Sequence, residues 1–330
     1  MEKDMIKVGI DVDSQYLVCR RLKQGRFANK TFSNCPEGHA KLIGWVSANG
    51  SHVQACMEAT GVYSFAVALA LSEQEGIEVS VMNPRLIKNF AQAWLQRGKT
   101  DQLDAGTILE YLIRMPFEPW QAPKGKLLSL QLLSRRILQL TTELRREKSR
   151  RHAALRMGKQ GKFLVHDIEV NMRHLKRRIE VIESQMLKLV SEEGQLQRQY
   201  DQLKSITGIA DKIAPRLLAE LSSLPTDMKA KQWVAYAGLD PRPYESGTLV
   251  KPRRISKLGN RYLRDALYLP AMTAARFDKH VQGYYEHLLE RGKKPKQALV
   301  AIMRKLLLAI WSMFKTGEDW CGQKFYKLAT

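Results

Sequence analysis

Two aspartates stand three positions apart in the stretch KTDQLDA, which covers residues 99–105. If this stretch is helical, Asp101 and Asp104 share one face, where like charges repel each other. A cation would relieve the repulsion, and it could be an Arg or Lys from elsewhere in the chain or a bound metal ion. The rest of the sequence has to decide between these alternatives.

Two further acids lie where strands are expected to end. Asp11 follows the apolar run in IKVGIDV, and Glu58 closes HVQACME directly before ATG. Taken singly, such acids are more often surface or capping residues, and Asp101 after Thr100 could simply start a helix. Taken together, two strand ends and one helix face could gather four carboxylates over a sheet. Such a cluster can hold two Mg²⁺ about 4 Å apart, one near the nucleophile and one near the leaving oxygen of a phosphodiester.

A candidate nucleophile lies far along the chain, in YESGT at residues 244–248. The Ser246 hydroxyl is a weak nucleophile unless it is deprotonated or bound to a metal, and Glu245 stands beside it. Gly247 would let a DNA backbone approach closely. A Ser before Gly in a polar loop is more often a turn residue, and Tyr244 is a rival nucleophile, although a stacking or packing role suits it better. Four nearby cations could bind phosphate: Arg242, Lys251, Arg253 and Arg254.

Lys and Arg outnumber Asp and Glu by 54 to 33, which gives a formal charge of +21 and a pI near 9.9. The excess favours a polyanionic partner, because each neutralised phosphate releases counterions.

The start, MEKDMIKVGI, has no apolar signal-peptide core. Arg304 and Lys305 interrupt the most apolar tract, so too few uncharged residues remain for a membrane span. The four cysteines show no metal-site spacing. We therefore expect a cytoplasmic protein with reduced cysteines that binds nucleic acid and no membrane.

The first region, to about residue 115, mixes strand and helix patterns. Short apolar or alternating runs predict strands over 6–12, 15–22, 26–32, 52–58 and 77–84. Helices are expected over 36–50, where Pro stands at the entrance and Asn-Gly at the stop, over 62–74, and from 85 onward. Three strands followed by strand–helix alternation predict a mixed α/β sheet.

The second region follows the Pro-containing link MPFEPWQAPKGK and carries two heptad seams. Lys and Arg crowd the other faces, and a basic, Gly-containing break, RMGKQGKF, separates the two helices. The pattern predicts a helical hairpin or an intermolecular coiled coil, which we favour over a mere spacer with solvated charges. The seam residues are Leu130, Leu133, Ile137, Leu140 and Leu144, then Ile168, Met172, Leu175, Ile179, Ile182, Met186 and Leu189.

The third region, from about residue 203, begins near SITGIADKIAPRLLAEL, which has the form of a helix-hairpin-helix. Backbone N–H groups of such a hairpin and of the next helix can hold a DNA phosphate, although an ordinary helix turn fits the pattern equally well. The stretch 233–268 is interpreted as a Pro/Gly-rich, basic loop that leads into the last helices. The residues expected to contact nucleic acid are Lys99, Arg145, Arg146, Arg150, Arg151, Lys176, Arg177, Arg178, Arg242, Lys251, Arg253, Arg254 and Lys257.

The chain resembles the DEDD transposases of the insertion sequence 110 family, which act as bridge-RNA-guided DNA recombinases and have the Piv invertases as relatives. The resemblance covers almost the whole chain and rests on GIDV, MEATGVY, NPRLIKNFA, KTDQLDA, SITGIADKIA, YAGLDPRPYESGT, ISKLGNRYLRDALYLPAM and GKKPKQALVAIMRKLL. It implies an RNase H-like (RuvC-like) catalytic domain over residues 1–118, whose acidic tetrad falls on Asp11, Glu58, Asp101 and Asp104. Asp13 departs from the pattern of the family, because it is a second acid close to Asp11. It would lie on the same pleat face as Asp11 if the strand continues that far.

The resemblance also implies a coiled-coil region over 119–202 that serves assembly and RNA binding. A mainly helical transposase domain over 203–330 would carry the nucleophilic serine, which matches Ser246. The implied activity is Mg²⁺-assisted cleavage and exchange of DNA strands through a serine–DNA link. The implied partners are double-stranded target and donor DNA, a structured bridge RNA, and further copies of the chain in a dimer or a tetramer of two dimers, with an active site shared between protomers.

Two other functions stay open at this stage. A Holliday-junction-type nuclease of the same fold would use metal-activated water in place of the serine and would form no covalent intermediate. A non-catalytic scaffold that binds RNA or DNA would keep all of its activity when the tetrad is changed.

Overall fold

The computed structural model describes residues 5–47, 52–94, 101–121, 125–242, 245–246, 249–250 and 254–328. For residues 62, 101, 102, 245, 246, 249 and 250 it describes the backbone alone. The chain forms two compact units, Met1–Ala122 and Pro123–Thr330.

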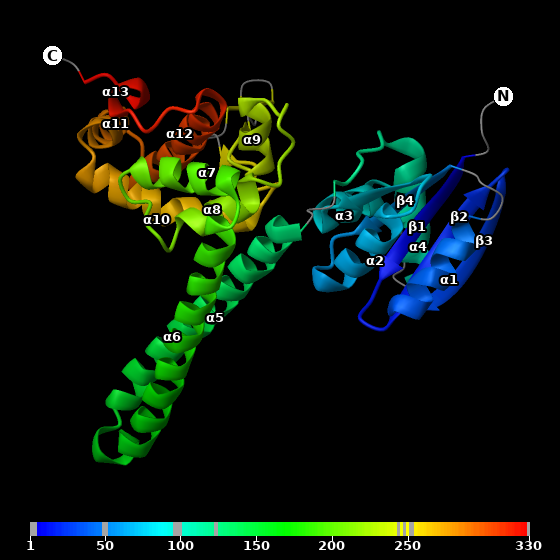
Figure 1. The fold of residues 1–330 in the computed structure, drawn as a ribbon, viewed down its shortest axis with the longest axis horizontal. Coiled ribbons are helices and arrows are strands. Elements are labelled where there is room, and N and C mark those ends of the chain that lie inside the picture. Colours follow the sequence, from blue (N-terminus) through cyan, green and yellow to red (C-terminus); the bar gives the residue numbers. More distant parts are fainter. Residues whose placement is uncertain are drawn as a thin grey trace. The chain divides into compact units, whose positions relative to one another are not determined.

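The first unit is built on one five-stranded mixed sheet with the strand order β3-β2-β1-β4-β5 (Figure 1). β2 is antiparallel to β1 and to β3, whereas β1, β4 and β5 are mutually parallel. The order and directions are consistent with the RNase H-like fold that the resemblance implies, and the predicted mixed sheet is confirmed. The strands are β1 (Ile6–Val12), β2 (Tyr16–Lys23), β3 (Arg26–Ser33), β4 (Val53–Glu58) and β5 (Ile77–Met82).

Helices cover both faces of this sheet. On one face, Ile10 and Met57 share a core with Leu42 of α1 (Pro36–Val46) and Leu71 of α2 (Val62–Ser72). On the other face, Cys56 shares a second core with residues of α3 (Pro84–Ala93) and α4 (Asp101–Arg114). Because side chains alternate along a strand, the pattern assigns each strand residue to one of these two faces.

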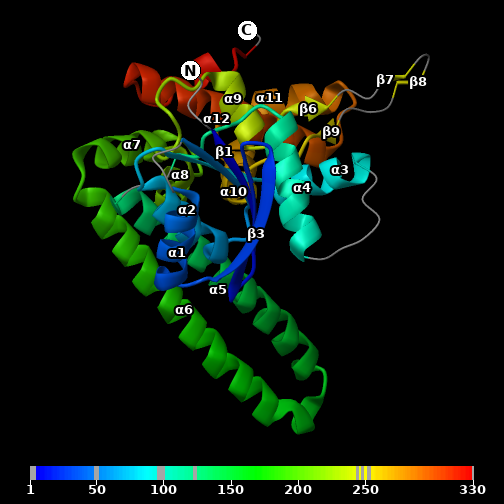
Figure 2. The same ribbon diagram turned by 90° about the vertical axis from the view of Figure 1, so that its right-hand side faces the viewer.

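The second unit begins with a helical hairpin, in which α5 (Gly125–Leu155) and α6 (Lys162–Ser191) pack side by side (Figures 1 and 2). The 3₁₀ helix η1 (Gly158–Gly161) connects the two, where the basic break was expected. Most of the predicted seam is buried: Leu130, Ile137, Leu140, Ile168, Leu175, Ile179 and Met186. The hairpin alternative therefore describes the single chain, and an additional intermolecular coiled coil stays a prediction.

Further helices complete the second unit and share one hydrophobic core with the hairpin. The predicted domain boundary at residue 203 falls inside α7. The stretch 233–268, interpreted as a loop, contains the end of α9 and the start of α10, because Trp233, Val234 and Leu263 are buried in this core. The helices are α7 (Gly194–Ser205), α8 (Ala214–Leu221), α9 (Ala230–Tyr236), α10 (Arg261–Phe277), α11 (Lys279–Glu290), α12 (Pro295–Thr316) and α13 (Gly322–Phe325).

α12 is the one helix within the described ranges that is long and apolar enough to cross a membrane, judged by length and composition. Its residues Ile302, Leu306 and Ile310 are fully buried in the core of the second unit. α12 therefore packs as a core helix.

The segment that resembles a helix-hairpin-helix consists of α7, a turn and α8. Gly208 lies in the turn with a φ of 94°, a conformation that favours glycine. A Cβ added there would lie 2.9 Å from Cβ of Thr273, so the turn packs closely on α10. Phosphate binding by this turn stays a prediction.

Candidate active site

Asp11 and Glu58 lie side by side at one edge of the sheet. In the parallel register of β1 with β4, Ile10 stands opposite Met57, and the next residues along the two strands are Asp11 and Glu58. Ile10 and Met57 belong to the core beneath α1 and α2, so the alternation directs both acids to the opposite face. That face is the one covered by α4, and both acids are half-buried there.

α4 packs directly on β1 at Gly9, two residues before Asp11 on the same face. A Cβ added to Gly9 would lie 2.4 Å from the carbonyl oxygen of Ala105 and 2.4 Å from the amide nitrogen of Leu109. The absence of a side chain at Gly9 thus lets the helix backbone touch the strand. Asp104 precedes Ala105 and is half-buried, so the contact brings the first turn of α4 to the face of Asp11 and Glu58.

We expect Gly9→Ala to destabilise the protein by about 1–3 kcal/mol, because the added methyl group must push α4 away from β1. Chemical denaturation would measure the change in the free energy of unfolding. Gly44→Ala is the matched control: Gly44 lies inside α1, and nothing stands within 4 Å of an added Cβ. That control should be neutral or more stable, since alanine favours helix over glycine by about 1 kcal/mol. Equal stability of Gly9→Ala and the unaltered protein would contradict the close contact.

The carboxylates suit Mg²⁺ in type, because this ion prefers oxygen ligands. Among the side chains that the structure describes, however, no three His, Cys, Asp or Glu residues form a group that could hold a metal ion. Asp101 is the first residue of α4, and its side chain lies outside the described part. Asp11 and Glu58 therefore share the face on which α4 packs, and the role of Asp11, Glu58, Asp101 and Asp104 as a metal-binding tetrad stays a prediction.

Asp13, the second acid of the first strand motif, is not on the pleat of Asp11. β1 ends at Val12, and Asp13 lies exposed in the turn to β2, where its carboxylate accepts a hydrogen bond from the backbone N–H of Ser14 at 2.5 Å. The Cys19 thiol lies on β2, the strand next to Asp11. Its burial is the main cause that raises its pKa, and the negative charge of Asp11 raises the pKa further. Cys19 is thereby kept protonated and is a packing residue.

Ser246 belongs to the second unit, whereas the four acids belong to the first. It lies in β7 (Glu245–Ser246), which pairs with β8 (Leu249–Val250) so that Ser246 stands opposite Leu249. β6 (Pro241–Arg242) pairs with β9 (Arg254–Ile255) closer to the helices. The described residues 241–242, 245–246, 249–250 and 254–255, which we call the arm, thus extend from the helices of this unit, with β7 and β8 farther out (Figure 2). The side chain of Ser246 and residues 243, 244, 247 and 248 lie outside the described part.

The base of the arm is held by a set of hydrogen bonds. The Ser256 hydroxyl donates to the Asp240 carboxylate at 2.5 Å, and the two residues are also joined through their backbones. The Arg264 guanidinium donates to the carbonyl oxygens of Ala237 and Gly259, at 2.8 and 3.1 Å. These bonds join the chain before the arm to the chain after it.

Asn260 links this base to a buried carboxylate. Its side-chain oxygen caps α10, and its amide nitrogen donates to Glu220 at 2.6 Å and to the Tyr236 hydroxyl at 2.9 Å. Glu220 is 1% exposed. Burial raises the pKa of its carboxyl, although Asn260, Arg135 and Arg216 act in the opposite direction. Sequence reasoning missed Asn260 and Arg264 as anchors of the arm, but Asn directly before a helical pattern is a capping signal that could have indicated the first of them.

The cations predicted to contact nucleic acid are mostly exposed on the second unit. Two on α5 are engaged within the chain: Arg150 pairs with Glu147, and Arg151 with Glu169, each at 2.6 Å. Lys99, Lys251 and Arg253 lie outside the described residues. The exposed members are Arg145, Arg146 and Arg150 of α5, Lys176, Arg177 and Arg178 of α6, and Arg242, Arg254 and Lys257 in and after the arm.

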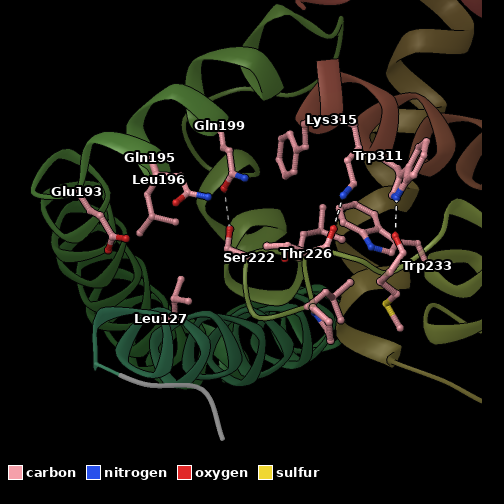
Figure 3. Close-up of a pocket in the computed structure, with 15 residues that line it drawn as sticks. Leu127, Glu193, Gln195, Leu196, Gln199, Ser222, Thr226, Trp233, Trp311 and Lys315 are labelled. Carbon is pink, nitrogen blue, oxygen red and sulfur yellow. Dashed lines mark hydrogen bonds between the residues drawn. The ribbon is translucent and has the colours of Figure 1, made fainter. Parts of the chain in front are cut away.

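A pocket of about 230 Å³ lies between α5, α7, α8, α9 and α12 (Figure 3). The Ser222 hydroxyl donates to Gln199 at its side, and the Trp311 indole N–H donates to the carbonyl oxygen of Met228. The buried indole nitrogen of Trp233 has no hydrogen-bond partner within the described residues. None of the predicted site residues lines this pocket.

Comparison with known proteins gives consistent matches along both units. Residues 8–158 match a DEDD-type IS110 family model described as "Transposase", and residues 200–286 match one described as "Transposase IS116/IS110/IS902 family". The chain is 28% identical over 318 residues to the pilin gene-inverting proteins of Moraxella bovis and Moraxella lacunata, which covers 94% of this chain and 96% of each relative. It is 30% identical over 115 residues to the "Insertion element IS110 uncharacterized 43.6 kDa protein" of Streptomyces coelicolor, covering 35% of this chain and 28% of that one.

Proposed function

The chain belongs to the IS110 family of transposases, and from this premise we propose that it is an RNA-guided, site-specific recombinase that cuts and joins DNA through a serine–DNA link. The family supports a DNA-cleaving, DNA-recombining enzyme. The finer mechanism rests mainly on one observation: Asp11 and Glu58 share one sheet face, and α4, the helix of Asp101 and Asp104, packs on that face at Gly9. Acids carried toward one sheet face by three separate elements are more typical of a functional site than of a purely structural one.

In the proposed reaction, the oxygen of Ser246 attacks a DNA phosphorus and forms a phosphoserine bond. The bond from phosphorus to the 3′ oxygen breaks, the serine proton is lost, and the released 3′ oxygen takes up a proton. The resulting 3′ hydroxyl reverses the step on a second strand, which exchanges the strands. When bound to Asp11, Glu58, Asp101 and Asp104, Mg²⁺ would supply Lewis-acid polarisation of the phosphate. Arg242 and Arg254, exposed on the arm near Ser246, would hold neighbouring phosphates.

The test is an incubation of labelled DNA with RNA and the unaltered protein in Mg²⁺, followed by denaturation. We expect label that migrates with the protein. Cleavage without such an adduct would favour the Holliday-junction-type nuclease instead. Binding without any cleavage would favour the non-catalytic scaffold.

We further propose that the chain assembles into a homo-oligomer through the helical hairpin. Several apolar side chains of the hairpin and its tip are exposed and could contact another copy. They are Leu155, Met157, Phe163, Leu164, Val170 and Val181, of which Phe163 is 83% exposed. A dimer, or a tetramer of two dimers, would let the arm of one protomer meet the acids of another.

RNA binding should depend on charge, because the exposed cations of α5 and α6 offer contacts to phosphates. If several phosphates are neutralised, the affinity for structured RNA should fall by about 10³ between 50 and 200 mM salt, as measured by filter binding. Arg177→Gln with Arg178→Gln should lower the salt slope by about 2, since each change removes one phosphate contact.

Lys293→Gln with Lys296→Gln is the matched control for this experiment, because it removes the same charge from exposed positions before and at the start of α12. That double variant should leave the slope nearly unchanged. A flat salt response of the unaltered protein, or recombination without any RNA, would refute the proposed RNA partner.

A further inference from the structure

Part of the sheet face that carries Asp11 and Glu58 is left open. On β3, the residues on this face are Phe27, Asn29, Thr31 and Ser33, and all four are exposed. Phe27, a large apolar side chain, is 52% exposed. α4 packs over β1, β2 and β4. The exposed surface therefore lies beyond α4, on β3.

The open surface lies close to the acids. In the sheet register, Asp11 stands opposite Val18 of β2, and Val18 stands opposite Thr31 of β3. Neighbouring strands are about 4.8 Å apart, so Thr31 lies roughly 10 Å from Asp11 on the same face. A strand of nucleic acid whose phosphate reaches Asp11 and Glu58 could continue across β2 and β3.

The charge of these two strands suits such an occupant. Within Tyr16–Lys23 and Arg26–Ser33 there is no Asp or Glu, and of the five cations Arg20 lies on the open face, whereas Arg21, Lys23, Arg26 and Lys30 alternate to the opposite face. A surface with this composition attracts phosphates and gives them no carboxylate to repel them.

Arg20 and Phe27 together form a fixed feature of the open face. The Arg20 guanidinium carbon lies 4.9 Å from the centre of the Phe27 ring, a cation–π arrangement. Arg20 also packs against α4, since a Cβ added to Gly106 would lie 3.1 Å from its Nη1 atom. A guanidinium for a phosphate next to an exposed ring for a base is the combination that binds single-stranded nucleic acid without reading its sequence.

We propose that the open face of β2 and β3 binds the DNA strand that is cut, with Arg20 holding a phosphate next to the scissile one and Phe27 stacking on a base. The inference rests on the proposed function, because it places the substrate of the same site. It adds a surface that would position the DNA strand beside the acids of the first unit.

The test compares single variants that leave the core untouched. Phe27→Ser should weaken binding of DNA that carries the cleavage site by about tenfold, the loss expected for one stacked base. Thr31→Glu should also weaken it, because a carboxylate on the open face repels phosphate, whereas the neutral Thr31→Gln should not. Lys30→Gln is the control on the opposite face, where Lys30 stands opposite Cys19, and it should bind DNA nearly as the unaltered protein does.

Photo-crosslinking provides the second readout. Benzoylphenylalanine at position 27 should crosslink to nucleotides next to the cleavage site, and the same group at position 30 should not. Crosslinks to RNA alone, or unchanged DNA binding by both Phe27→Ser and Thr31→Glu, would overturn the inference. If the unaltered protein still forms the covalent adduct in that case, the proposed function stands and only the location of the strand is wrong. If it forms none, the proposed function itself is refuted.

Discussion

Replacing Ser246 with alanine should abolish both DNA cleavage and the covalent protein–DNA adduct. The change deletes one oxygen, so folding, assembly and DNA binding should be retained. Because Ser246 lies in the two-residue strand β7 of the arm and loses only a hydroxyl, the melting temperature should stay within a degree or two of the unaltered protein. Labelled DNA incubated with RNA, Mg²⁺ and the variant, then denatured, would measure the adduct.

Two comparisons sharpen this experiment. Ser246→Cys should form the adduct only in trace amounts, since a thiolate is nucleophilic but binds Mg²⁺ poorly. Arg242→Gln, a change in the same arm, should lower DNA affinity and leave some adduct at saturating DNA. An adduct that persists in Ser246→Ala would place the nucleophile elsewhere, and Tyr244 would be the first residue to replace.

Removing the charge of Asp11, Glu58, Asp101 or Asp104 should lower the cleavage rate by about 10³-fold or more. The loss corresponds to the several kcal/mol by which a bound metal stabilises charge in a transition state. The variants Asp11→Asn, Glu58→Gln, Asp101→Asn and Asp104→Asn keep the shape of each side chain, and RNA binding should survive in all four. Single-turnover cleavage in Mg²⁺ gives the rate of each variant.

Asp13→Asn is the matched control for the tetrad, because Asp13 lies exposed in the turn after β1 and not on the face of Asp11. It should cleave DNA nearly as fast as the unaltered protein. A second readout does not depend on cleavage: Mg²⁺ should raise the melting temperature of the unaltered protein and of Asp13→Asn, and should do so less in Asp11→Asn. Full activity in any one tetrad variant would remove that residue from the site.

The sequence alone determined the elements of the first unit and the positions of its acids. Strict alternation in IKVGIDV and the short apolar run in QYLVCRRL predict strands, and the Asp101 and Asp104 spacing predicts one helix face, because these signals arise within a few residues of the chain. The seam from Leu130 to Leu189 likewise predicts long amphipathic helices. It left open whether they pair within one chain or between two.

The tertiary structure decided the arrangements that depend on residues far apart in the chain. The short connection at η1 folds α5 back along α6, so the two seams bury each other within the chain. The approach of α4 to Gly9 brings Asp104 to the face of Asp11, and nothing near Gly9 in the sequence indicates which helix will touch it.

The same holds for the base of the arm, where Arg264 reaches back to Ala237, and Asn260 to Glu220. A local pattern records which way a side chain faces along its own strand or helix. Which distant backbone meets that side chain follows only from packing of the complete chain, because the contact forms only when both elements are in place.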